Sequence, residues 1–103
     1  MSSELSESGE VLTIRVSGSF DFNMHREFLR AYQNFSPAPK LYCIDLSETL
    51  HLDSAALGML LLLRDHCLDT AEDGLPCIEL QNANEHVANI LAVSNFDKIF
   101  KVR

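Results

Sequence analysis

The chain has 103 residues, of which 47% are hydrophobic and 22% charged, and this composition is that of one globular domain with one hydrophobic core. Its formal net charge is −7 and it contains no basic stretch, which excludes recognition of a nucleic-acid backbone. It also contains no apolar run long enough to span a bilayer. Its acidic, polar start, MSSELSESGE, lacks the pattern of a signal peptide, so we expect a cytoplasmic protein without membrane association.

Two strands are predicted before residue 20. Leu5 lies in a short edge strand, which ends in a turn at residues 8–10. Residues 11–17 alternate between apolar and polar side chains, and this alternation predicts a strand buried on one face. The inward side chains are Leu12, Ile14 and Val16.

A helix is predicted next. Apolar side chains recur every three or four positions over residues 23–35, as in an amphipathic helix, and either Asp21 or Asn23 can cap its start. We expect the aromatic rings of Phe20 and Phe22 to lie in the core.

The central segment consists of a strand, a loop and a long helix. Residues 41–46 form an apolar run of the kind found in strands buried on both faces. A polar loop follows, and from Ser54 onward Ala, Leu and Met dominate without a Pro, which predicts a helix. Either Asp53 or Ser54 can cap this helix, because a short oxygen-bearing side chain accepts a hydrogen bond from an otherwise unpaired amide. The segment therefore places a hydroxyl group at the positive end of a helix.

A helical wheel, at about 100° per residue, divides the long helix into two faces. The face expected to cover the sheet carries Ala56, Met59, Leu60, Leu63 and Cys67. The opposite face carries Ser54, Gly58 and Asp65, flanked by Leu61 and Leu62. Two leucines beside a polar stripe either are covered by a neighbouring helix or form a docking patch beside the serine.

The C-terminal part predicts an acidic loop at residues 69–76, a strand at 76–80, a third helix capped by Asn84 and a last strand at 99–102. Strands separated by helices indicate parallel neighbours joined by right-handed crossovers. We therefore expect an α/β fold in which about three helices pack on a four- to five-stranded mixed sheet, with residues 1–103 as a single domain.

The three cysteines, Cys43, Cys67 and Cys77, have no paired spacing and lie in apolar contexts, so we expect reduced, buried thiols. The four histidines are scattered, and no metal ligands recur at a short interval. We expect neither a metal nor a cofactor.

Four segments have the character of motifs. Gly18-Ser19-Phe20-Asp21 precedes the first helix, Ile44-Asp45-Leu46-Ser47 ends the buried strand, residues 51–58 open the long helix, and residues 95–100 lie near the C-terminus. They resemble, in order, the G-x-h-D turn, the strand end, the h-D-S-S/T-G-L-G signature and the closing G-h-x-x-h-h segment of the STAS domain family, where h is hydrophobic. Within that family the chain is most similar to the bacterial anti-sigma factor antagonists.

The resemblance implies a phosphorylation site at Ser54, because the family's phosphoacceptor is the serine directly after the aspartate. Ala55 stands where the family has a second Ser or Thr, and Ala56 stands where it has the first Gly, so Ser54 is the only acceptor in this loop. The expected partner-binding residues are Asp21, Asp53, Ser54, Ala55, Gly58, Leu61 and Leu62.

The resemblance also implies a switch. The unmodified protein would bind an anti-sigma factor or a related regulator, a serine kinase with a histidine-kinase-like ATPase domain would break the complex, and a metal-dependent serine phosphatase would restore it. The physics is consistent with this, since a phosphate adds roughly −1.5 to −2 charges, which a helix N-terminus tolerates but an interface beside Asp53 and Glu48 does not.

Three alternatives remain. An enzyme is disfavoured, because His51, Asp53 and Ser54 are crowded into one loop and cannot form a catalytic triad. The binding of a nucleotide or lipid is a second alternative. The chain contains no Gly-rich phosphate loop for it, although an apolar groove near Leu61 and Leu62 is open to a ligand. In a constitutive binding module, Ser54 would serve only as a helix cap.

Overall fold

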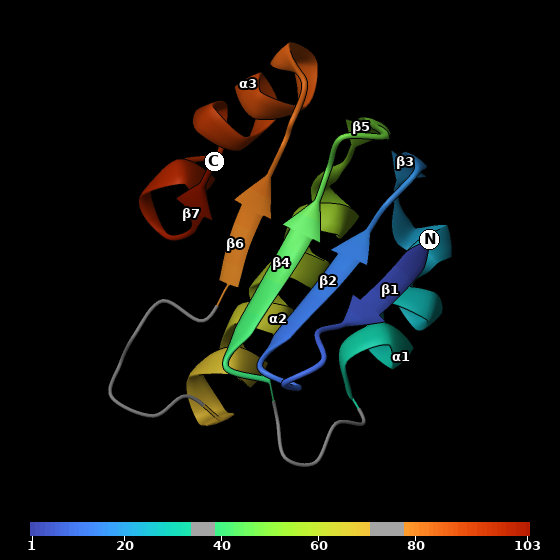
Figure 1. The fold of residues 1–103 in the computed structure, drawn as a ribbon. Coiled ribbons are helices and arrows are strands. Elements are labelled where there is room, and N and C mark those ends of the chain that lie inside the picture. Colours follow the sequence, from blue (N-terminus) through green and yellow to red (C-terminus); the bar gives the residue numbers. More distant parts are fainter. Residues whose placement is uncertain (34–38, 71–77) are drawn as a thin grey trace.

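The computed structural model describes residues 1–33, 39–70 and 78–103 (Figure 1). Its elements follow the alternation of strand and helix patterns in the sequence. They are β1 (Ser2–Leu5), β2 (Val11–Arg15), β3 (Gly18–Phe20), the 3₁₀ helix η1 (Phe22–Met24), α1 (His25–Gln33), β4 (Leu41–Asp45), β5 (Thr49–Leu52), α2 (Ser54–Thr70), β6 (Ile78–Gln81), α3 (Glu85–Val93), the 3₁₀ helix η2 (Phe96–Lys98) and β7 (Lys101–Val102).

The main sheet has five strands in the order β1-β2-β4-β6-β7. β2, β4, β6 and β7 run parallel, and β1 pairs antiparallel with β2 at one edge. Parallel neighbours need long crossover connections, and these carry helices onto a face of the sheet. Figure 1 shows α1 and α2 on the same face, behind the strands. The expected α/β fold with a mixed sheet and three α-helices is confirmed.

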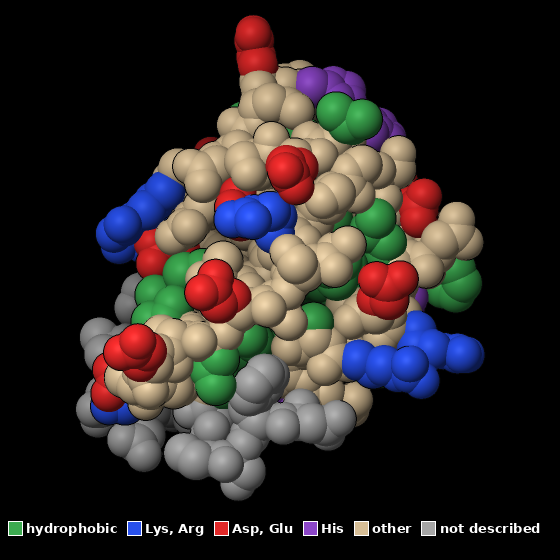
Figure 2. Space-filling view, turned by 45° about the vertical axis from the view of Figure 1, so that its right-hand side comes forward, with side chains coloured by type: hydrophobic (Ala, Val, Ile, Leu, Met, Phe, Trp, Pro, Cys, Tyr) green, Lys and Arg blue, Asp and Glu red, His purple; other side chains and the backbone are tan. Residues whose placement is uncertain are grey.

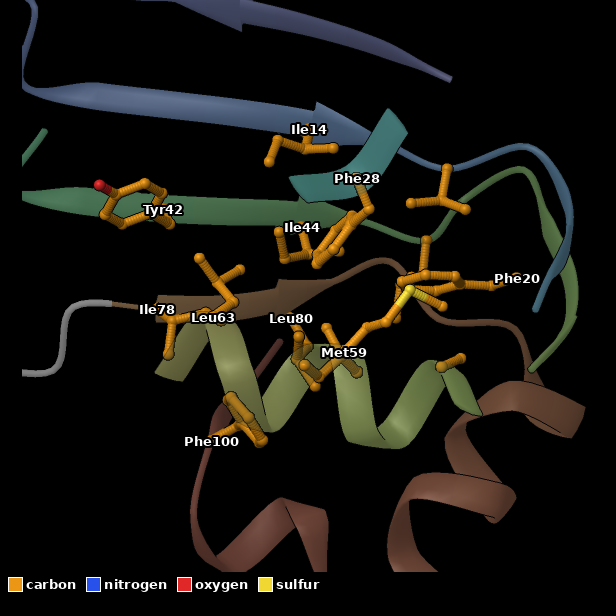
Figure 3. Packing of buried hydrophobic residues seen from close by; sticks show 14 of the residues in the cluster. Ile14, Phe20, Phe28, Tyr42, Ile44, Met59, Leu63, Ile78, Leu80 and Phe100 are labelled. Atoms are coloured by element: carbon orange, nitrogen blue, oxygen red, sulfur yellow. The ribbon is translucent and has the colours of Figure 1, made fainter. Parts of the chain in front are cut away.

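The core lies between this face of the sheet and α2. On β4 the side chains of Tyr42 and Ile44 point to the helices and are fully buried, and Figure 3 shows Met59 and Leu63 of α2 pointing toward the sheet. All five residues assigned by the helical wheel to the sheet-facing side of α2 are buried, so that prediction is confirmed. They are Ala56, Met59, Leu60, Leu63 and Cys67.

A second, two-stranded parallel sheet formed by β3 and β5 was not among the predicted elements. It continues the β2–β4 pair beyond a short break, because β3 follows β2 and β5 follows β4 along the chain. At the break Gly18 adopts φ +74°, a conformation that favours glycine, and its N–H donates to the carbonyl of Glu48. The loop predicted before the long helix is therefore largely a strand.

The ends of three predicted elements can be compared with the structure. The first helix begins as η1 and continues as α1 to Gln33, while Phe35, the last residue of the predicted helix, lies outside the described residues. The third helix is capped by Asn84 as predicted, and its side chain accepts a hydrogen bond from the N–H of Val87 at 2.8 Å. The last strand, predicted over residues 99–102, is reduced to the two-residue β7, and residues 99 and 100 form the turn between η2 and β7.

Cys43 and Cys67 are buried, as predicted, and Cys77 lies outside the described residues. Burial, the nearby Glu79 carboxylate and, in the opposite direction, Arg103 act on the Cys43 thiol, and the net effect raises its pKa. Such a thiol is a poor nucleophile at neutral pH. Within the described part of the chain, none of the helices is both long and apolar enough to cross a membrane.

Candidate functional site

Ser54 is the first residue of α2, and its side chain is exposed. Asp53 caps the helix, since its Oδ1 accepts a hydrogen bond from the N–H of Ala56 at 2.9 Å and its carbonyl accepts one from Leu57 at 3.1 Å. The sequence left the cap open between Asp53 and Ser54, and the geometry assigns it to Asp53. The hydroxyl of Ser54 makes no hydrogen bond to any residue that the structure describes, so it does not cap the helix.

The segment that carries Ser54 is anchored from two sides. The N–H of Asp53 donates to the carbonyl of Phe20 at 3.4 Å, which ties the end of β5 to β3. Thr49, at the start of β5, is fully buried, and its Oγ1 donates to the carbonyl of Val16 at 2.7 Å. The Asn84 side chain donates to the carbonyl of Thr49 at 2.9 Å. The position of Ser54 is therefore set by β2, β3 and the start of α3.

Asp45 fastens the ends of three neighbouring strands. Its Oδ1 accepts hydrogen bonds from the N–H of Ser47 at 2.9 Å and the amide of Asn82 at 3.4 Å, and its Oδ2 pairs with Nε of Arg15 at 3.1 Å. Burial raises the pKa of Asp45, but the hydrogen bonds from Ser47, Arg15 and Asn82 outweigh it and lower the pKa to about 2. The sequence offered one signal for this role, an aspartate that ends an otherwise apolar strand.

Asp21 caps η1, because its Oδ1 accepts from the N–H of Asn23 at 3.0 Å, which decides between the two predicted caps. Phe20 is fully buried, as expected. The expectation for Phe22 was wrong, since its ring is 71% exposed and stacks on His25 with the ring centroids 5.8 Å apart. The ring leaves the core because Phe22 follows the capping residue, where the chain turns outward into η1.

The outer face of α2 presents two partly covered leucines. Leu61 is 39% exposed and Leu62 is 53% exposed, although α1 lies next to α2. Leu62 lines one wall of a hollow of about 10 Å³ between the two helices, opposite His25 and Phe28 of α1. Neither leucine is fully covered by the neighbouring helix, so an apolar surface remains beside the exposed Ser54 and Gly58.

Of the expected partner-binding residues, the structure thus brings most to one side of α2. Asp53, Ser54 and the half-buried Ala55 form the first turn and its cap, and Gly58, Leu61 and Leu62 continue along the exposed face. Asp21 lies at the end of β3, and β3 pairs with the strand that leads into Ser54. Sequence reasoning missed Phe22 on this side, because Phe is among the residue types most often buried.

The histidines do not form a catalytic group with Ser54. His51 lies on β5 and is exposed, and its Nδ1 is 2.9 Å from Nε2 of His86 at the start of α3. Within the described residues, no hydrogen bond joins Ser54 to a histidine, and no three His, Cys, Asp or Glu side chains gather as metal ligands. Among the described residues, Ser54 thus contributes an exposed hydroxyl beside an apolar surface.

Figure 2 shows acidic and basic side chains interspersed over the face in view, with basic side chains next to one another only at its lower right. Near the site, Glu48 accepts a hydrogen bond from Ser17 at 3.0 Å, which places an acidic side chain at the break between β2 and β3. Together with the net charge of −7, this makes a phosphate-binding surface on the face in view unfavourable.

Comparisons with known proteins agree over almost the whole chain. A family model described as "Mlab, STAS domain" matches residues 3–102. A STAS-domain containing protein of Pseudomonas aeruginosa (strain UCBPP-PA14) is 45% identical over 97 residues, which are 94% of this chain and 92% of that protein.

Two solved structures have the same fold. A protein described as an anti-sigma factor antagonist of Thermotoga maritima superposes with a TM-score of 0.80 at 17% identity, covering 98% of this chain and 83% of that one. The anti-sigma factor antagonist SpoIIAA in its unphosphorylated form superposes with a TM-score of 0.74 at 16% identity, covering 99% of this chain and 86% of that one. At these identities the likeness concerns the fold alone.

Proposed function

The chain belongs to the STAS domain family, and from this premise we propose that it is a protein-binding switch controlled by phosphorylation of Ser54. In the unmodified state it binds an anti-sigma factor or a related regulator, in the manner named for its structural neighbours. A serine kinase with a histidine-kinase-like ATPase domain breaks the complex, and a metal-dependent serine phosphatase restores it. On this proposal residues 1–103 act as one cytoplasmic, non-enzymatic domain.

The observation that carries the proposal is the separation of cap and hydroxyl at the start of α2. Asp53 satisfies the N–H of Ala56, so a kinase that modifies Ser54 removes no hydrogen bond that holds the helix. The phosphate would stand at the positive end of a 17-residue helix, where unpaired N–H groups favour a negative charge. The modified domain should therefore keep its fold.

Phosphorylation of Ser54 should, in contrast, weaken the binding of a partner. A partner that covers Ser54 also covers the exposed parts of Leu61 and Leu62, and it would have to remove water from the phosphate without supplying a counter-charge. An unpaired buried charge of this kind costs about 2 to 5 kcal/mol of binding free energy. This corresponds to a loss of roughly 30-fold or more in affinity.

The surface of the proposed complex comprises the expected residues and one more. Asp21, Asp53, Ser54, Ala55, Gly58, Leu61 and Leu62 are its expected members. Phe22 joins them because it stacks on His25, which lines the same small hollow as Leu62. An exposed aromatic ring beside two leucines is the kind of anchor that contributes most to binding free energy.

A small-molecule ligand beside Leu62 is the weaker reading. The hollow between α1 and α2 has a volume of about 10 Å³. This is room for a single water molecule rather than for a nucleotide.

The test is a pull-down from the native lysate with wild type, Ser54→Ala and Ser54→Asp side by side. Wild type and Ser54→Ala should retain the same partner, and Ser54→Asp should lose it. Ser3→Asp is the matched control. Ser3 is an exposed serine on the edge strand β1, and its substitution adds the same charge away from the site.

Phosphopeptide mapping after incubation with the cognate kinase should give Ser54 as the only site. Thr49 is fully buried and serves as an internal control. A main site on Ser2, Ser3 or Ser47, or a Ser54-phosphorylated protein that binds its partner as tightly as wild type, would contradict the proposal.

A further inference from the structure

Two histidines meet at the end of the molecule that carries β5 and α3. His51 Nδ1 and His86 Nε2 are 2.9 Å apart, and the two rings stack with centroids 5.2 Å apart and planes inclined by 22°. Both side chains are exposed. Histidine side chains gather at the top of the molecule in Figure 2, the end at which Figure 1 shows β5 and α3.

We propose that His51 and His86 form a two-imidazole site for a divalent transition metal of the Ni(II) or Cu(II) class. Imidazole nitrogens bind such metals at about 2.0 to 2.1 Å. Two ligands at right angles then lie about 2.9 Å apart, whereas tetrahedral ligands lie about 3.4 Å apart. The observed separation is that of a hydrogen bond, and it also equals the spacing of adjacent ligands in the square-planar or octahedral coordination that Cu(II) and Ni(II) prefer, so rotation of the two exposed rings would direct both nitrogens at one metal.

The backbone already holds the two ligands in register. His51 lies on β5 two residues after Thr49, and His86 lies two residues after Asn84. The Asn84 side chain binds both the carbonyl of Thr49 at 2.9 Å and the N–H of Val87 at 2.8 Å, and so joins the two ligand-bearing segments. A metal would therefore bind without first ordering the chain, which lowers the entropic cost of binding.

The surroundings leave room for the rest of the coordination sphere. His86 borders a shallow surface depression that is also lined by Asn84, Glu85 and Asn89. Their oxygen atoms and water can complete the sphere around a hard or borderline cation, and the net charge of −7 attracts it. With only two imidazole ligands we expect an exchangeable site rather than a permanent one.

Binding needs a lone pair on both facing nitrogens. In the hydrogen-bonded pair one of them carries a hydrogen, and this hydrogen must move to the other nitrogen of the same ring before the metal binds. The bound metal would join β5 to α3. Since β5 leads directly into Asp53 and Ser54, the metal would also restrain the start of α2.

The test is titration calorimetry of the untagged chain with Ni(II), a metal that the protein's thiols do not reduce, followed by Zn(II) and Cu(II). Wild type should bind one Ni(II) per chain, with an affinity above that for Zn(II) under the same conditions. His51→Ala and His86→Ala should each lose at least about tenfold in Ni(II) affinity, because one imidazole cannot chelate. His25→Ala is the matched control and should bind like wild type, since His25 lies on α1 and stacks on Phe22.

Melting curves without metal show whether the variants are folded, and Ni(II) should raise the melting temperature of wild type and His25→Ala only. The proposal is overturned if His51→Ala or His86→Ala binds Ni(II) as tightly as wild type. It is equally overturned if wild type takes up no Ni(II), or if His25→Ala loses the same affinity as the pair variants.

Discussion

The two faces of α2 both carry leucines, but only one of them is buried. Leu60 and Leu63 are completely buried against the sheet, whereas Leu61 and Leu62, on the same helix, are 39% and 53% exposed. The inner face stabilises the fold, and the outer face, with Ser54 at its start, leaves apolar side chains accessible. On the proposed function, folding and binding can therefore be altered separately in this domain.

The largest effect on stability is expected from the inner face. Leu60→Ala should lower the free energy of unfolding by about 2 to 5 kcal/mol, since it leaves a cavity in the core. Leu62→Ala, two residues away, should lower it by less than about 1 kcal/mol and should instead weaken partner binding. Urea melts and titration calorimetry of both variants measure the two quantities. A core-sized loss of stability at Leu62 would show that the outer face is internal packing.

The second effect concerns the carboxylate that fastens the strand ends. Asp45→Asn should cost about 1 to 3 kcal/mol near neutral pH, because charge-assisted hydrogen bonds to Ser47, Arg15 and Asn82 are weakened. The folded-state pKa of about 2 lies below the unfolded value of about 3.9. The stabilisation is therefore complete above about pH 4 and is lost as the pH falls through about 2.

The measurement is the difference in unfolding free energy between wild type and Asp45→Asn along a pH series. This difference should shrink toward zero between about pH 4 and about pH 2. Asp65→Asn, on the exposed face of α2, is the control and should show no comparable difference at any pH. A gap between wild type and Asp45→Asn that stays constant over this range would mean that the charge does not carry the effect.

The third effect separates the helix cap, Asp53, from the proposed phosphoacceptor, Ser54. Asp53→Ala should cost about 0.5 to 2 kcal/mol, because the N–H of Ala56 loses its acceptor. Ser54→Ala should stay within about 0.5 kcal/mol of wild type, since the hydroxyl has no capping role. Thermal melts of the two variants compare them directly. The reverse ranking would restore Ser54 as the cap and would favour the constitutive binding module.

The smallest effect on stability is expected at the exposed aromatic ring. Phe22→Ala should change the free energy of unfolding by less than about 0.5 kcal/mol, while Phe28→Ala, almost completely buried, should cost about 3 to 5 kcal/mol. On the proposed partner surface, Phe22→Ala should weaken binding by roughly tenfold, or about 1.4 kcal/mol. Calorimetry with the isolated partner checks this. Unchanged affinity would remove Phe22 from the interface.

The sequence predicted the main sheet, the three helices and the inner face of α2, because their patterns are local and long enough to read. Residues 11–17 and 41–46 show strand patterns in isolation, and the 3.6-residue period of α2 separates Leu60 and Leu63 from Leu61 and Leu62. The start of α2 was also predictable, since Asp53 and Ser54 are both good caps. Which of them accepts the hydrogen bond depended on backbone geometry that no periodicity describes.

The elements that were missed are short or depend on distant partners. β3 and β5 have three and four residues, too few for an alternation to emerge, and they pair because β2 and β4 have already brought their chains together. Phe22 was placed in the core by its residue type, whereas its exposure follows from the turn capped by Asp21.

The sequence by itself thus determined the order of strands and helices, the buried side of each and a serine at the start of a helix, since these follow from spacing between near neighbours. Only the tertiary structure decided that Asp53 and not Ser54 is the cap, that Phe22 and Leu62 border the same surface, and that His51 meets His86. Residues 51 and 86 are 35 positions apart, and no sequence pattern around either histidine predicts that they meet. Their contact exists because the connection from β5 through α2 and β6 brings the start of α3 next to β5.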